Sequence, residues 1–155
     1  MDGIWSDMLS ALRTEFADIP DIEEATRVVL RLGMAMLLGA MIGYEREAAG
    51  KAAGLRTHML VALGSAMFVL VPLQAGVPLA DMSRVLQGIA SGIGFLGAGA
   101  IIKLNSEESI KGLTTAASIW MVSAIGVAAG MGREATALLA TIFTLVILEI
   151  LQRVK

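Results

Sequence analysis

The chain has 155 residues, of which 56% are apolar and 17% are charged, and it contains one histidine and no cysteine. A soluble domain ordinarily carries about 25% charged residues, so this composition is typical of a membrane protein. The missing cysteines exclude disulfides and thiolate metal sites, and the net charge of −2 gives no electrostatic basis for binding nucleic acid.

Residues 1–20 are predicted to form an amphipathic helix that lies in the membrane interface. Apolar side chains recur there at helical spacing, from Ile4 and Trp5 to Phe16, and charged side chains occupy the other side. Pro20 is expected to end this helix. The segment has no basic stretch followed by a short apolar one, so we expect no cleavable signal peptide.

Five apolar stretches follow, and each is predicted to cross the membrane as a helix, because a span needs about 20 mostly apolar residues. They form a predicted transmembrane domain over residues 21–155, with spans near 25–44, 57–76, 85–102, 112–131 and 135–152. The predicted fold class is therefore an all-α membrane protein with about five spans.

The sequence also contains a duplicated helical hairpin. With an offset of 58 residues, the segment from Leu38 to Ala66 matches the segment from Leu96 to Ala124 at eight of 29 positions without a gap. Each copy ends one apolar stretch, crosses a polar loop and begins the next. We therefore expect two tandem hairpins related by a pseudo-twofold axis along the membrane normal.

The distribution of basic residues predicts the orientation of the chain. Seven Lys and Arg residues lie on the side of the two repeat loops and the C-terminus, against five on the other side. Because cytoplasmic segments are enriched in Lys and Arg, the N-terminus is expected outside and the C-terminus in the cytoplasm. Both repeat loops would then be cytoplasmic.

The third predicted span is rich in glycine, which favours close packing of helices. Two interpretations remain open: a helix buried at the centre of the bundle, and a contact between two copies of the chain. Its GIGFLG string matches G-x-G-x-x-G, but no strand precedes it, so a dinucleotide site is not predicted. The residues predicted to serve helix packing are Gly39, Gly43, Gly88, Gly92, Gly94, Gly97 and Gly99.

Each polar loop of the repeat runs into Gly-Leu-x-Thr at the predicted start of a helix. The first N–H groups of a helix lack backbone partners and favour anions. The loops could be solvated connections, or the helix start could hold Glu45 or Glu47 from the other loop. Alternatively, it could bind a phosphate aided by Arg56, or the carboxylates could bind a cation such as Mg²⁺. The candidate cluster consists of Glu45, Arg46, Gly54, Arg56, Thr57, His58, Gly112, Thr114 and Thr115.

No catalytic residue and no cofactor are predicted. The middles of the predicted spans contain no Asp, Glu, Lys or His, so no series of ionisable groups crosses the bilayer. A nucleophile paired with a base is likewise not evident, and one histidine cannot by itself form a zinc site. The sequence therefore argues against an enzyme and weakens the case for a transporter.

Two stretches resemble the MgtC/SapB family of bacterial inner-membrane proteins: GAMIGYEREAAGKAAGLRTHMLVALGSAMF, and GIASGIGFLGAGAIIK followed by KGLTTAASIWMVSAIGVAAGMG. The resemblance implies a bundle of about five spans with a cytoplasmic C-terminus. It also implies a role in adaptation to low Mg²⁺, to acid or to life inside a host, exerted through other membrane proteins such as the ATP synthase. Better-known members continue into a soluble ACT-like domain, so this chain resembles the short form.

The leading hypothesis is a non-enzymatic modulator in the inner membrane. It would contact itself and other inner-membrane proteins through the glycine-rich span and the cytoplasmic loops, so the expected partners are the lipid bilayer, further copies of the chain and those proteins. The alternative is a small ion or proton conductor, or a transporter subunit, with Glu45 and His58 at its cytoplasmic mouth.

Overall fold

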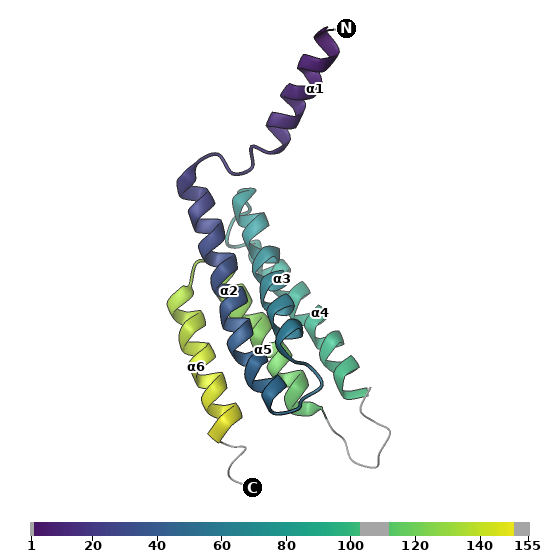
Figure 1. The fold of residues 1–155 in the computed structure, drawn as a ribbon, viewed down its shortest axis with the longest axis vertical. Coiled ribbons are helices and arrows are strands. Elements are labelled where there is room, and N and C mark those ends of the chain that lie inside the picture. The colour runs from purple at the N-terminus through teal and green to yellow at the C-terminus, as the bar shows by residue number, and fades with distance from the viewer. Residues whose placement is uncertain (1, 103–111, 151–155) are drawn as a thin grey trace. The chain divides into compact units, whose positions relative to one another are not determined.

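In the computed structural model, residues 2–102 and 112–150 are described, and they form six helices and no strand (Figure 1). The helices are α1 (Asp2–Glu15), α2 (Ile22–Ala48), α3 (Leu55–Gln74), α4 (Met82–Ile102), α5 (Leu113–Gly130) and α6 (Glu134–Ile150). Residues 1–30 and residues 31–155 form separate compact units.

Within the described residues, four helices are long and apolar enough to cross a membrane: α2, α3, α4 and α5. The fifth predicted span corresponds to α6, which has 17 described residues, and its expected continuation to residue 152 lies outside the described part. The described ends of α2 to α6 lie within four residues of the predicted ends. The chain is therefore an all-α membrane protein.

The first unit shows where α1 ends and why α2 begins early. Helix α1 ends at Glu15 rather than near residue 20, five residues before Pro20. A side-chain oxygen of Asp21 accepts a hydrogen bond from the backbone N–H of Glu24 at 2.8 Å. This N-cap starts α2 at Ile22, three residues ahead of the prediction.

Helix α1 has an apolar side that stays exposed, with Ile4, Trp5 and Met8 among its members. Such a helix buries its apolar side in the boundary between headgroups and acyl chains when it lies on a membrane. The interfacial position of α1 remains a prediction.

Three helices of the second unit are followed by glycines with a left-handed backbone. Gly50 has φ 66°, Gly76 has φ 79° and Gly132 has φ 73°. Beyond them, Lys51 N–H donates to the Arg46 carbonyl at 3.0 Å, and Arg133 N–H donates to the Ala128 carbonyl at 2.9 Å. These bonds satisfy carbonyls that a helix end would leave unpaired, so the turns after α2 and α5 are short.

Helix α5 lies at the centre of the second unit and packs against α3, α4 and α6. Half of its span is buried (50%), whereas 6% of the α4 span is buried. The interpretation in which the glycine-rich helix α4 is buried at the centre is therefore wrong for the single chain. The core residues are Ala35, Leu38, Ile42, Ala62, Ala66, Val122, Ile125, Ala129, Ala137 and Leu148.

The central position of α5 depends on two glycines that face α3. A Cβ atom added to Gly126 would lie 2.2 Å from the carbonyl oxygen of Ala62. At Gly130 it would lie 2.4 Å from the carbonyl oxygen of Ala66. Only glycine fits at such distances, and without a side chain the two backbones can approach closely.

The duplicated hairpin is present in three dimensions. Ser65 and Ser123 are equivalent positions of the two copies, and their hydroxyl oxygens are 2.8 Å apart. Gly39 meets the backbone of His58, and the equivalent Gly97 meets Ala116, which is the counterpart of His58. Because two equivalent residues touch each other, the pseudo-twofold axis passes between Ser65 and Ser123.

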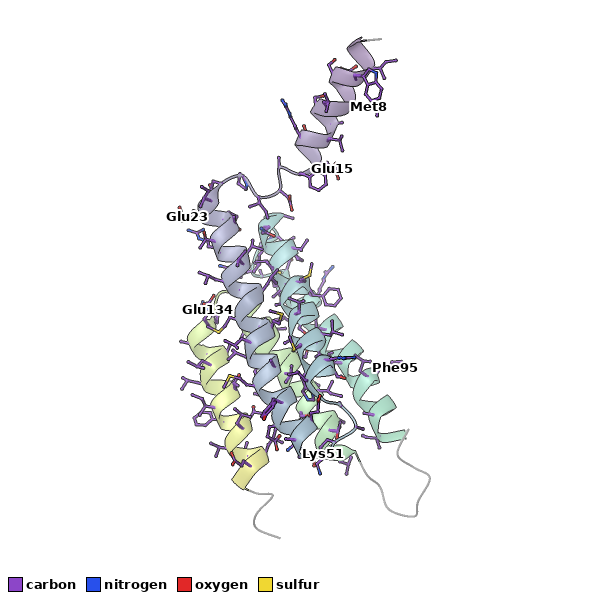
Figure 2. All side chains as sticks on the ribbon, viewed as in Figure 1. Met8, Glu15, Glu23, Lys51, Phe95 and Glu134 are labelled. Atoms are coloured by element: carbon purple, nitrogen blue, oxygen red, sulfur yellow. The ribbon has the colours of Figure 1, made fainter. Side chains whose placement is uncertain are left out.

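The outside of the bundle is apolar, as expected of helices that face lipid. Large side chains such as Leu60, Phe95 and Phe143 are exposed, and Figure 2 shows Phe95 directed away from α4. In lipid these side chains are solvated by acyl chains, so their exposure is stable there.

Candidate functional site at the first turns of α3 and α5

Polar residues of three helices meet at the end of the bundle where α2 passes into α3. Glu45, Arg46 and Glu47 belong to the last turn of α2, and His58 belongs to the first turn of α3. Ser118 lies in the second turn of α5. The site therefore joins the two copies of the repeat.

Arg46 and Glu45 form a buried bidentate ion pair. The Nε and Nη2 atoms of the arginine donate to the two carboxylate oxygens, and the side chains are 1% and 18% exposed respectively. Removing charges from water is costly, and only good geometry offsets that cost. Arg46 is therefore held by a carboxylate adjacent to it in the chain.

His58 links α3 to α5 and is fully buried. Its Nδ1 lies 2.9 Å from the carbonyl oxygen of Gly54, and its Nε2 lies 3.0 Å from the hydroxyl of Ser118. A carbonyl can only accept, so Nδ1 carries a hydrogen and donates it. The Ser118 hydroxyl lies 2.8 Å from the carbonyl oxygen of Thr115. It donates either to that carbonyl or to Nε2.

A carboxylate of the protein occupies the start of α3. Glu47 accepts a hydrogen bond from the backbone N–H of Leu55 at 2.9 Å. A Cβ atom at Gly54 would lie 2.5 Å from a carboxylate oxygen of Glu47, so glycine leaves room for this contact. The structure thus has an internal carboxylate at the helix start. It comes from the same loop, whereas the sequence interpretation placed there a carboxylate of the other loop.

The predicted cluster is only partly assembled. Glu45, Arg46, Gly54 and His58 lie together, and Thr115 joins them through its backbone. The other predicted members, Arg56, Thr57 and Thr114, are exposed. Gly112 stands before α5 with φ 96°, a conformation that favours glycine. The charged residues of the second loop, Lys103, Glu107, Glu108 and Lys111, lie outside the described residues.

The predicted packing glycines fall into two groups. Gly39 and Gly43 are in close contact with α3, since an added Cβ would lie 2.8 Å from the Ala62 side chain and from the Leu55 Cα respectively. Gly97 faces Ala116 at an ordinary 3.4 Å. The four remaining glycines, Gly88, Gly92, Gly94 and Gly99, have no neighbouring heavy atom within 4 Å of an added Cβ.

Hydrogen bonds within the chain account for the buried polar groups of this site. In the described part of the chain, every buried side-chain nitrogen or oxygen has a partner. Among the same residues no three His, Asp or Glu side chains gather as a metal site requires. The arrangement is chemically suited to hold α2, α3 and α5 in register.

Three residues important for packing, Ser118, Gly126 and Gly130, were not identified from the sequence. Ser118 bonds His58 across the two repeats. The signal for Gly126 and Gly130 was available, because small residues four apart mark close helix contacts. For Ser118 the sequence carries no such signal, because its partner lies 60 residues away.

Comparison with known proteins identifies relatives of similar sequence. Protein SrpB of Synechococcus elongatus is 44% identical over 136 residues, which cover 81% of this chain and 75% of the relative. Putative magnesium transporter YhiD of Escherichia coli K12 is 39% identical over 129 residues, with 79% of this chain and 59% of the relative covered. Protein MgtC of Salmonella typhimurium is 45% identical over 117 residues, with 76% and 49% covered.

The chain thus spans about half to three quarters of the length of these relatives. No solved structure matches the chain. The sequence model of the MgtC family matches residues 32–155, which include α3, α4, α5, the larger part of α2 and the polar site described above. The chain belongs to the MgtC family.

Proposed function

We propose that this chain is a non-enzymatic protein of the bacterial inner membrane that acts by contacting other membrane proteins. Its role would be adaptation to Mg²⁺ limitation or to acid stress. The name of the Escherichia coli relative, putative magnesium transporter, supports a connection with magnesium. In this proposal the N-terminus lies outside and the loop around Lys51 lies in the cytoplasm.

The exposure of α4 is the observation that carries the proposal. This helix has small residues along its length, yet 6% of its span is buried. Gly94 is exposed, and a Cβ atom there would meet nothing within 4 Å. Ala98 is exposed one turn further on. In lipid, small residues spaced four apart let a second helix approach closely, so this outer side of α4 is suited to bind another helix.

The cluster at the first turns of α3 and α5 supports a contact function rather than conduction. Its ion pair and its histidine are engaged with groups of the same chain. The helices of the described part carry no ionisable residue in the middle of a span. A proton or ion pathway across the bilayer would need such groups or a water-filled pore.

Self-association through α4 is tested first, with a second copy of the chain as the partner. The full chain is reconstituted in lipid vesicles, and energy transfer between labelled copies is measured. Gly94→Leu is expected to weaken self-association at least tenfold, because the larger side chain separates the two helices. Gly33→Leu is the matched control, since an added Cβ at Gly33 also meets nothing within 4 Å. Equal association of Gly94→Leu and the parent would contradict the proposal.

The physiological part is tested with a deletion strain grown in low Mg²⁺ and in acidic medium. Parent and Gly33→Leu genes are expected to restore growth, whereas Gly94→Leu is not. Flux of Mg²⁺ or protons into vesicles that contain the purified protein, above that of empty vesicles, would favour the alternative of a conductor.

A further inference from the structure

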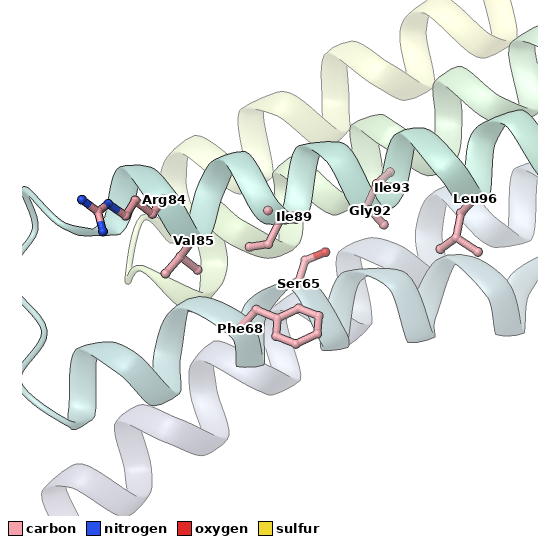
Figure 3. A pocket seen from close by; sticks show the side chains of 9 residues that line it. Ser65, Phe68, Arg84, Val85, Ile89, Gly92, Ile93 and Leu96 are labelled. Atoms are coloured by element: carbon pink, nitrogen blue, oxygen red, sulfur yellow. The ribbon is translucent and has the colours of Figure 1, made fainter.

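An apolar groove runs between α3 and α4, and all its lining residues belong to these two helices. Its volume is about 480 Å³, and α3 contributes Ser65 and Phe68 to it. Helix α4 contributes residues along one side of the helix, from Arg84 at one end of the groove to Leu96 at the other. Figure 3 shows these α4 residues following one another along the helix opposite Phe68.

Glycines keep the groove open. Gly88 and Gly92 line it, and a Cβ atom at either position would meet no heavy atom within 4 Å. Helices α3 and α4 both pack mainly against α5, so the space between them is not closed by their own side chains. In a membrane an apolar groove of this kind is filled by hydrocarbon.

Between its ends the groove offers no free polar side-chain group. Its one hydroxyl, that of Ser65, is already bonded to Ser123 at 2.8 Å. Apart from Arg84 at one end, the remaining wall consists of apolar side chains and glycine. An occupant that placed a polar group there would leave it without a partner, which is costly in an apolar site. The middle of the groove therefore selects an acyl chain.

A cation stands at one end. Arg84 lies in the first turn of α4 and is exposed, and no carboxylate of the described residues forms an ion pair with it. Asp81, three residues before it, is also exposed. The Arg84 backbone N–H donates to the Asp81 carbonyl at 3.3 Å, but the described side chains of the two residues form no ion pair. The guanidinium presents several donors in a fork that matches phosphate, and the positive end of the helix dipole adds to the attraction. This end of the groove therefore favours an anionic phosphate group.

The length of the groove matches one leaflet. From Arg84 to Leu96 the helix rises about 18 Å at ~1.5 Å per residue. The hydrocarbon core is ~30 Å thick, so one leaflet contributes about 15 Å. A helix of a second copy would need a groove along the whole thickness, whereas a lipid needs one leaflet.

We propose that the groove between α3 and α4 binds one anionic phospholipid, with its phosphate at Arg84 and an acyl chain between the two helices. The site is separate from the outer side of α4 used in the proposed function, because Gly94 and Ala98 do not line it. The two proposals can therefore fail independently.

The test uses the purified full chain in mild detergent, with native mass spectrometry of bound lipid. Phosphatidylglycerol is the anionic probe, and phosphatidylcholine is the zwitterionic one. The parent is expected to retain one phosphatidylglycerol per chain and to prefer it at least tenfold over phosphatidylcholine. No preference, or no retained lipid, would overturn the proposal.

Two kinds of variant separate the acyl chain from the headgroup. Gly92→Leu fills the groove and is expected to reduce retention of both lipids at least tenfold, and Gly88→Leu serves as a second filling variant if the first does not fold. Arg84→Gln is expected to remove the preference for phosphatidylglycerol and to keep lipid in the groove. Gly33→Leu and Arg133→Gln are the matched controls, since Arg133 is also an exposed arginine at the start of a helix.

The alternatives give different results. If both filling variants fold and retain phosphatidylglycerol as the parent does, the groove does not hold the lipid. If they abolish dimers and leave lipid retention unchanged, a second copy occupies the groove and the proposal is overturned. An unchanged lipid preference in Arg84→Gln would show that the arginine does not select the headgroup.

Discussion

At the scale of single residues, this bundle depends on backbone contacts and hydrogen bonds rather than on the hydrophobic effect. Lipid is as apolar as a leucine side chain, so burial from lipid gives helices little reason to associate. Gly126 and Gly130 bring α5 against the backbone of α3, and Ser65 bonds Ser123 across the same contact. These positions should therefore be the most sensitive in the chain.

Gly126→Ala is expected to destabilise the protein by about 1–3 kcal/mol, as overpacking of a filled contact does. The new methyl group would lie 2.2 Å from the Ala62 carbonyl oxygen, so one helix must move. Thermal unfolding in detergent measures the effect, and Gly33→Ala is the control in open space. Equal melting of Gly126→Ala and the parent would contradict the described packing of α3 on α5.

The hydroxyl pair of Ser65 and Ser123 is suited to a double-mutant cycle. Interhelical hydrogen bonds in membranes contribute about 0.6–1.7 kcal/mol to stability. The free energy of unfolding of each single alanine variant should therefore be lower by that amount. The double variant should lose no more than either single one, because both remove the same bond. Unfolding in mixed micelles measures the cycle, and additive losses would mean that the two hydroxyls do not interact.

Glu47→Ala is expected to cost about 0.5–2 kcal/mol, as the loss of a helix cap does. The carboxylate accepts a hydrogen bond from Leu55 N–H, and the variant leaves that donor to water. Glu47→Gln should retain part of the stabilisation, because its amide oxygen can still accept the hydrogen bond from Leu55 N–H. Lys51→Ala, at an exposed loop position, should melt like the parent; a comparable loss there would show that the loop is sensitive for another reason.

At the scale of elements, the helices of the bundle differ in how extensively they pack against one another. Helix α5 contacts three others, whereas α4 packs mainly against α5, on a side that includes Gly97, and more lightly against α3. The rest of α4 is open. A substitution on α4 should therefore act on stability or on association depending on its position around the helix.

Gly97 provides the test of that distinction. Gly97→Ala should be tolerated, because its Cβ would lie at an ordinary 3.4 Å from Ala116. Gly97→Leu should lower the melting temperature and the yield of folded protein, since the larger side chain does not fit between α4 and α5. Circular dichroism during heating gives the comparison. A Gly97→Leu variant as stable as the parent would show that α4 does not pack on α5 as described.

At the scale of the whole molecule, the fold is a pair of antiparallel hairpins followed by one further helix. Successive helices from α2 to α6 run in opposite directions, so the turn after α2 and the turn after α5 lie on opposite faces of the membrane (Figure 1). This follows from crossing the bilayer an odd number of times between them. The positive-inside rule then predicts the cytoplasmic face for the first of the two turns.

Single-cysteine variants can test this topology cleanly, because the chain has no cysteine of its own. In intact spheroplasts a membrane-impermeant thiol reagent should label Arg133→Cys and spare Lys51→Cys. Permeabilised cells should label both. Labelling of both positions in intact spheroplasts would contradict the antiparallel arrangement, and labelling of Lys51→Cys alone would reverse the orientation.

Much of this architecture was accessible from the sequence because hydropathy and repetition are local signals. The ends of the helices follow from the lengths of the apolar stretches, and Gly50 and Gly132 lie in the turns between helices. The outer position of α4 could not be predicted from the sequence, because both α4 and α5 contain small residues at helix-packing spacing. Only the three-dimensional packing shows that α5, with Gly126, is the central helix. The link from His58 to Ser118 was equally hidden. It depends on how two helices rotate against each other, which spacing along the chain does not encode.

The bond between Ser65 and Ser123 also bears on the origin of the fold. A single hairpin that paired with its twin about this axis would have placed one serine against itself. Within one chain the two halves need not be identical. Position 58 is a histidine and its counterpart is Ala116, so the polar link through His58 to Ser118 has no side-chain equivalent in the other copy.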